Sequence, residues 1–263
     1  MFKANRQTKG KAPMKKIQIA TLTIVILSSI LCAACSQEPS SPKIEDWNTI
    51  RNATVLITMQ SPNPDQTFEN STFLAYGVGS LIEYQGEILL VTHNHWNNLD
   101  TATIVKFYDA DNSQITVIIK NRFVESIVYA DAGTLVIRPP QAVIDQLAPV
   151  SVQSIPQVEV GETVEVVYRE NPSREKVAIK QAVVEEIAIY NDEPVYRLRS
   201  LDGQTIQPGD SGGGIWYKGC LIGNNWTVTA KSIRTVNTST SAEEEKIVYT
   251  DISYGAIWSE AIR

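Results

Sequence analysis

The chain has 263 residues, of which 43% are hydrophobic and 20% charged, an ordinary composition for a globular protein with a sizeable core. Its formal net charge is −6. Residues 1–34 hold six of the 23 lysines and arginines and none of the 29 acidic residues, so residues 35–263 carry 17 basic against 29 acidic residues, a net charge of −12. Because phosphate binding needs a basic face, this balance argues against nucleic acid as a partner.

The N-terminal segment has the order of a secretory signal peptide. Six positive charges precede an uncharged, mostly apolar run over residues 17–34, and Met14 is an alternative start because two lysines follow it. The run ends in LCAAC, which resembles a bacterial lipobox and implies that Cys35 becomes a lipidated first residue, although Cys32 stands where an aliphatic residue is usual. We therefore expect an exported lipoprotein of a bacterial cell envelope, anchored in the lipid bilayer. A single uncleaved anchor and ordinary secretion are the alternatives.

The cysteines predict a domain without disulfides. Cys32 falls in the signal, Cys35 is the lipidation candidate, and Cys220 is left alone, which favours a small core residue over a reactive thiol. No spacing of ligand residues indicates a metal cluster, so we expect neither a metal nor a cofactor.

After a polar, proline-rich tether over residues 35–48, the chain alternates β-rich runs with turn sequences. The runs in the first half are 53–59, 71–84, 87–92, 102–108, 115–119 and 134–138. Those in the second half are 158–160, 162–169, 177–190, 195–200, 214–217, 220–229 and 246–250. Residues 141–147 predict a short helix or an irregular crossover, and residues 237–245 an exposed polar loop. Many short strands favour an all-β antiparallel barrel or sandwich, divided near Pro139 and Pro140.

The end of the chain predicts a helix. Its apolar residues recur at helical spacing on one face, namely Tyr254, Ile257, Trp258, Ala261 and Ile262.

Residues 209–214 read GDSGGG and place Ser211 between glycines. Glycines allow a sharp turn that exposes the hydroxyl and turns backbone N–H groups toward a ligand. A serine hydroxyl is a poor nucleophile unless a base lies within hydrogen-bond reach and a third group orients that base.

The chain offers two candidate bases, His93 and His95, where an apolar strand ends in the sequence LVTHNHW. The candidate carboxylate is Asp131, which opens the apolar run DAGTLVI and which could equally serve as a turn cap. The other acidic residues between the histidines and the serine belong to polar turns, namely Asp100, Asp109 and Asp111.

These motifs together resemble the chymotrypsin/trypsin family of serine proteases over residues 53–263. GDSGG matches the nucleophile motif, and THNH matches Thr-x-x-His, which selects His95 over His93. GSLI at 79–82 matches the hairpin before that histidine, and DAGTL is similar to the family's Asp motif. YTDI at 249–252 resembles the strand that precedes the closing helix of the second barrel.

The resemblance implies two six-stranded antiparallel barrels, about 49–140 and 141–263, with a short C-terminal helix and a cleft between the barrels. It implies a serine endopeptidase acting on peptide or protein substrates. In it, Ser211 is the nucleophile, His95 the general base and acid, and Asp131 the group that orients His95. The N–H groups of Gly209 and Ser211 would form the oxyanion hole, and Thr205 would lie near the floor of the specificity pocket.

Departures from the family pattern limit what carries over. No cleavable Ile-Val-Gly-Gly sequence is present, so Asp210 is held by something other than a new N-terminus, or the site forms without cleavage. Thr205 is not an acid, which argues against a preference for lysine or arginine, and two histidines are too few for a histidine-based glutamate pocket. We expect the pKa of His95 near 6.5 or somewhat above it, because of the adjacent carboxylate.

Three alternatives to a serine endopeptidase differ in what the sequence says of them. An α/β-hydrolase is excluded, because its triad histidine follows the serine and no histidine follows Ser211. A catalytically inactive relative that binds peptides or a partner protein in the same cleft, and a structural lipoprotein with an accidental motif, stay open.

Overall fold

The computed structural model describes residues 47–62, 72–97, 104–120, 126–170, 176–203, 206–236 and 243–258. The predicted signal peptide, Cys35, most of the tether and Thr205 lie outside these ranges. The described chain is nearly all β, and its three helical segments are short: α2 (Trp47–Asn52), the 3₁₀ helix η2 (Asn94–Asn97) and α3 (Gln141–Ile144). None of the helices in these ranges has the length and apolar character needed to cross a membrane.

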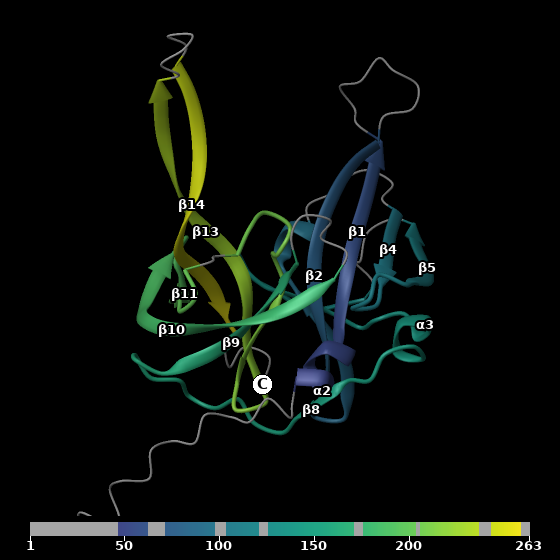
Figure 1. Cartoon of the computed structure of the whole chain (residues 1–263). Helices are drawn as coiled ribbons and strands as arrows, with labels where there is room; N and C mark the ends of the chain where they lie inside the picture. Colours follow the sequence, from purple (N-terminus) through teal and green to yellow (C-terminus); the bar gives the residue numbers. More distant parts are fainter. Residues whose placement is uncertain are drawn as a thin grey trace, which may run out of the picture. The chain divides into compact units, whose positions relative to one another are not determined.

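The first half forms an eight-stranded sheet (Figure 1). Its strands are β1 (Thr54–Pro62), β2 (Thr72–Tyr84), β3 (Glu87–Thr92), β4 (Ile104–Tyr108), β5 (Gln114–Lys120), β6 (Ile127–Ala130), β7 (Leu135–Ile137) and β8 (Val150–Val152). Seven of them follow the antiparallel order β5-β4-β1-β2-β3-β7-β6, and β8 pairs with β2 in parallel. The first sheet therefore extends to Val152, past the predicted boundary at Pro140.

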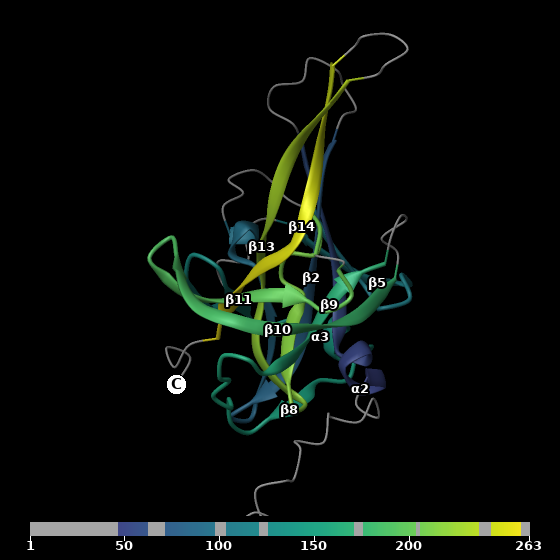
Figure 2. The ribbon, with the colours of Figure 1, turned by 60° about the vertical axis from the view of Figure 1, so that its left-hand side comes forward.

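The second half closes into a six-stranded barrel in the order β10-β11-β14-β13-β12-β9. Its strands are β9 (Thr163–Arg169), β10 (Val177–Tyr190), β11 (Glu193–Ser200), β12 (Gly214–Tyr217), β13 (Cys220–Val236) and β14 (Glu243–Ile257). β10 and β11 join through Asn191 and Asp192, both at positive φ, as a tight hairpin requires. β13 and β14 run on beyond the barrel as a two-stranded ribbon (Figures 1 and 2).

The all-β class and the division into two β halves are confirmed, but two local predictions are wrong. The predicted C-terminal helix is instead the end of β14 as far as Ile257, and residues 259–263 lie outside the described ranges. Residues 254–256 pair with both β11 and β13, and the ring of Tyr254 is stacked on that of Tyr190. Residues 243–245, expected in a loop, pair with β13.

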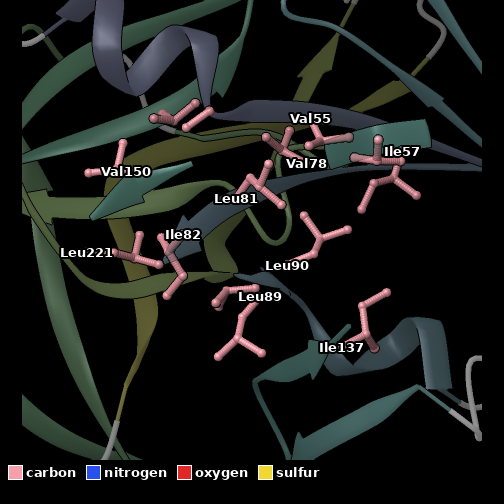
Figure 3. Packing of buried hydrophobic residues seen from close by; sticks show 14 of the residues in the cluster. Val55, Ile57, Val78, Leu81, Ile82, Leu89, Leu90, Ile137, Val150 and Leu221 are labelled. Atoms are coloured by element: carbon pink, nitrogen blue, oxygen red, sulfur yellow. The ribbon is translucent and has the colours of Figure 1, made fainter. Parts of the chain in front are cut away.

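One continuous apolar cluster stabilises the first sheet and reaches into the second barrel. Leu81, Leu90 and Ile57 are buried with at most 1% exposure, and Figure 3 shows them packed with Leu221 of β13 in the same cluster. Trp216 of β12 belongs to this cluster as well. Each such side chain contributes roughly 1.5–3 kcal/mol when fully buried. The shared core therefore holds the two halves together.

Candidate active site

The loop over residues 209–214, here called the serine loop, is held by main-chain hydrogen bonds to both halves. The carbonyl of Ser211 accepts a bond of 2.9 Å from the N–H of Val78 in the first sheet. The N–H of Gly212 donates over 2.8 Å to the carbonyl of Asn225 in the second barrel. Gly209 and Gly212 have φ of +101° and +86°, values that side-chain-bearing residues rarely adopt. The backbone path thus requires glycine at positions 209 and 212.

Two N–H groups of the serine loop are left free by this pattern. In the described part of the chain, no backbone carbonyl accepts from the N–H of Gly209 or of Ser211, whereas the N–H groups of Asp210, Gly212 and Gly213 are all bonded. The two free donors are the pair that the sequence predicts as an oxyanion hole. Free, fixed N–H groups are what a developing negative charge on a carbonyl oxygen needs.

Asp210 is held by the main chain. It is 2% exposed, and its carboxylate accepts from the N–H of Arg169 over 2.9 Å and from the N–H of Gln207 over 2.6 Å. A buried carboxylate with such bonds is satisfied without a newly cut N-terminus. This agrees with the absence of a cleavage motif in the sequence.

The histidines lie on a turn that packs directly against the serine loop. β3 ends at Thr92, His93 follows, and His95 lies in η2. A Cβ on Gly212 would lie 2.3 Å from the hydroxyl oxygen of Thr92 and 2.9 Å from the backbone nitrogen of His93. Only glycine therefore allows the serine loop to approach this turn so closely. The rings of His93 and His95 lie 4.5 Å apart between centroids.

Both histidines are neutral near neutral pH. Burial lowers the pKa of His95 to about 4 and, with a further contribution from the charge of His95, lowers the pKa of His93 to about 3. The expected pKa of His95 near or above 6.5 is therefore not found, because burial dominates and no carboxylate in the described ranges bonds to the ring. A neutral imidazole can still accept a proton from a hydroxyl.

The carboxylate of Asp131 bonds within its own turn, residues 131–134, here called the acid turn. It accepts from the N–H groups of Gly133 and Thr134, at 2.8 and 2.6 Å, and from the hydroxyl of Tyr129, at 2.7 Å. Among the described residues, no hydrogen bond joins Asp131 to the ring of His95, or His95 to Ser211. The link between the acid turn and η2 is instead the bond from the Asn94 side chain to the Asp131 carbonyl. The turn-cap role that the sequence left open is the one observed.

Three consecutive residues of β13, Asn224 to Trp226, connect these segments, and none of the sequence motifs named above contains them. The side chain of Asn224 bonds to the Gly133 carbonyl at 3.0 Å and to the Thr134 hydroxyl at 2.9 Å. Asn225 bonds through its backbone to the serine loop and through its side chain to β9. Both asparagines are fully buried. The signal in the sequence is the pair of amides inside an apolar strand.

The third residue, Trp226, lies at a β-bulge, where the pairing with β14 shifts between Asn225 and Thr227. A bulge redirects a side chain. The indole lies 6.2 Å from the His93 ring between centroids and occupies the space where a Cβ on Gly133 would be. It also meets Tyr190 edge-on at 5.0 Å. Trp226 therefore packs against both the histidine turn and the acid turn.

Other candidate groups contribute little to this site. Cys220 is a free thiol and is partly exposed, and burial raises its pKa, which makes the reactive thiolate less available. The described ranges contain no group of three or more His, Cys, Asp or Glu residues placed to hold a metal ion. The predicted roles of Thr205 and Cys35 stay predictions.

Among solved structures, similarity is found to serine proteases at low sequence identity. The inactive form of a serine-to-alanine mutant of Rv3671c from M. tuberculosis H37Rv is 14% identical, with a TM-score of 0.50 over 85% of this chain and 90% of that chain. The Rv3671c protease in its inactive form is 15% identical, with a TM-score of 0.49 over 84% and 91%. Deg5 is 16% identical, with a TM-score of 0.47 over 72% and 86%. No protein-family model and no curated protein matches the sequence. The first of these similarities shows a chymotrypsin-like serine protease fold.

Proposed function

We propose that the chain is a serine endopeptidase that hydrolyses peptide bonds through an acyl-enzyme on Ser211. The observation that carries this proposal is the close packing of the serine loop on the histidine turn, with the N–H groups of Gly209 and Ser211 left free. A neutral His95 on the adjoining turn supplies a base. The fold, which is that of serine proteases, is consistent with this chemistry.

In the proposed reaction, the Ser211 hydroxyl attacks the carbonyl carbon of the scissile bond while its proton passes to His95. The two free N–H groups stabilise the oxyanion, a contribution of roughly 3 kcal/mol per donor. The C–N bond then breaks as His95 returns the proton to the amine, and water repeats the sequence to release the acid. Asp131 would orient His95 only after its side chain rotates out of the acid turn, so we place that rotation at substrate binding.

A second candidate function is peptide binding without catalysis. It is favoured by one observation: the carboxylate of Asp131 bonds to Tyr129, Gly133 and Thr134 instead of to His95. A protein of this kind would bind peptides in the same cleft and leave them intact.

A fluorophosphonate probe distinguishes the two functions, because only an activated serine reacts with it. We expect the wild-type protein to be labelled at Ser211. Ser211→Ala should abolish labelling, and Ser211→Ala and His95→Ala should each lower peptide hydrolysis by a factor on the order of 10⁴–10⁶. Ser113→Ala, at an exposed loop position, is the control and should be labelled like the wild type. A folded wild-type protein that is neither labelled nor active would favour peptide binding.

A further inference from the structure

His93 occupies the N-cap position of the 3₁₀ helix that carries His95. It directly precedes η2, and its ring Nδ1 accepts a hydrogen bond of 3.0 Å from the N–H of His95, the second residue of that helix. Ser, Thr, Asp and Asn usually make this bond, which satisfies one of the free N–H groups at a helix start. Here an imidazole makes it, so the backbone of His95 is tied to the ring of His93.

This bond fixes the protonation of His93. A neutral imidazole has one donor and one acceptor nitrogen, so a ring that accepts at Nδ1 carries its proton on Nε2. That Nε2 is buried and has no hydrogen-bond partner among the described residues. Neither nitrogen can therefore accept a proton from Ser211 without breaking the bond to His95, which argues against His93 as the base.

The ring of His93 is also fixed by packing. It is 8% exposed and lies between His95, at 4.5 Å, and Trp226, at 6.2 Å, measured between ring centroids. Gly212 of the serine loop leaves no room for a Cβ beside the His93 backbone nitrogen. A ring held from these sides transmits its position to the residue that it caps.

We propose that His93 is a positioning residue for His95: its Nδ1 bond and ring contact set the direction of the candidate base while the Asp131 carboxylate stays in the acid turn. The catalytic consequence rests on the proposed function. The hydrogen bond and the tautomer do not depend on it.

The kinetic test compares His93→Asn with His93→Ala. An asparagine oxygen can accept the same N–H, whereas alanine cannot. We expect His93→Ala to lower kcat about tenfold with little change in KM, and His93→Asn to stay within about threefold of the wild type. A tenfold change corresponds to about 1.4 kcal/mol, which lies within the usual cost of losing an N-cap bond. Equal losses in the two variants would assign His93 a packing role only and overturn the proposal, as would the absence of any loss.

The spectroscopic test does not depend on turnover, and its measurement of the His93 tautomer needs only the wild-type protein. Only two histidines are present, so nitrogen-15 NMR of the imidazoles can assign both. We expect the Nε2–H tautomer for His93 and slow hydrogen exchange of the His95 amide in the wild type and in His93→Asn, with exchange at least about tenfold faster in His93→Ala. An Nδ1–H tautomer, or equal exchange in all three proteins, would overturn the proposal. Failure of the fluorophosphonate reaction in the wild type would reject the proposed function and leave this test intact.

Discussion

The serine loop and the acid turn are both short turns attached to β13, and they differ in what their N–H groups do. In the acid turn, the N–H groups of Gly133 and Thr134 are bonded to the carboxylate of Asp131 itself. In the serine loop, the carboxylate of Asp210 accepts from the N–H groups of Arg169 and Gln207, and no backbone carbonyl of the described residues accepts from Gly209 or Ser211. The acid turn therefore bonds its own N–H groups to its own carboxylate, whereas the serine loop, within the described residues, has two N–H groups without a carbonyl partner.

The difference shows that a matching motif does not fix where a side chain points. An aspartate that opens a turn is bonded within the turn unless a stronger partner competes. A buried, neutral His95 is a weak competitor for the carboxylate, because it carries no charge. In the serine loop, the direction of the backbone does not depend on competing side-chain partners, since the positive φ values of Gly209 and Gly212 fix it.

After the substitutions of Ser211 and His95, the largest effect is expected from Asp131→Asn, which tests whether the carboxylate ever leaves the acid turn. Asparagine keeps an oxygen for the two backbone N–H groups, so the free energy of unfolding should change by less than about 1 kcal/mol. Peptide hydrolysis should nevertheless fall by about 10³–10⁴ if the carboxylate orients His95 during the reaction. Steady-state kinetics and urea unfolding measure the two quantities.

Asp109→Asn is the matched control for this substitution. Asp109 bonds to the N–H groups of Asp111 and Ser113 in the same manner, but in an exposed turn. Both its activity and its stability should stay close to those of the wild type. If Asp131→Asn also kept full activity, the carboxylate would act only as a turn cap, and the acid turn would have no part in the reaction.

A smaller effect, on stability, is expected from Gly212→Ala. The new Cβ would lie 2.2 Å from the Val78 carbonyl oxygen and would require φ near +86°. We expect a loss of about 2–5 kcal/mol in the free energy of unfolding, from strain and overpacking together. Gly86→Ala shares the positive φ but meets open space, so it should lose only about 1–2 kcal/mol. Equal losses in the two variants would contradict the close packing on the histidine turn.

The smallest effect, counted per histidine and per pH unit, is the expected change of the free energy of unfolding with pH. The folded pKa values of His93 and His95 are about 3 and about 4, below the unfolded value of about 6.5. The unfolded state therefore binds more protons between these limits. The stabilisation is complete above pH 6.5 and is lost as pH falls toward 4 and then 3, by about 1 kcal/mol per histidine and pH unit.

Urea midpoints at pH 7.5, 5.5 and 4.5 measure this loss. Replacing both histidines by asparagine removes the two groups and should flatten the profile over the same range. An unchanged slope in that variant would show that other groups cause the acid sensitivity. The acid limb of peptide hydrolysis should likewise fall near pH 4 instead of near 6.5.

The parts of the fold that sequence predicted well are those set by local pattern. Runs of β-branched residues bounded by turn residues gave most strands, and the glycines of residues 209–214 gave the serine loop. Over residues 254–257 the predicted helix is wrong, because short apolar runs fit both periods and the pairing of β14 with β11 and β13 decides the outcome. The orientation of Asp131 and the redirection of Trp226 depend on tertiary contacts that spacing does not contain.

The contacts of Asn224, Asn225 and Trp226 with three separate segments make the geometry of the site a property of strand alignment. Successive residues of a strand face opposite sides, so a shift of β13 by one position would exchange all three contacts at once. A molecule in which β13 is misaligned would therefore lose the contacts of all three residues with the site at the same time. Folding of the second barrel and assembly of the candidate site are in this sense a single event.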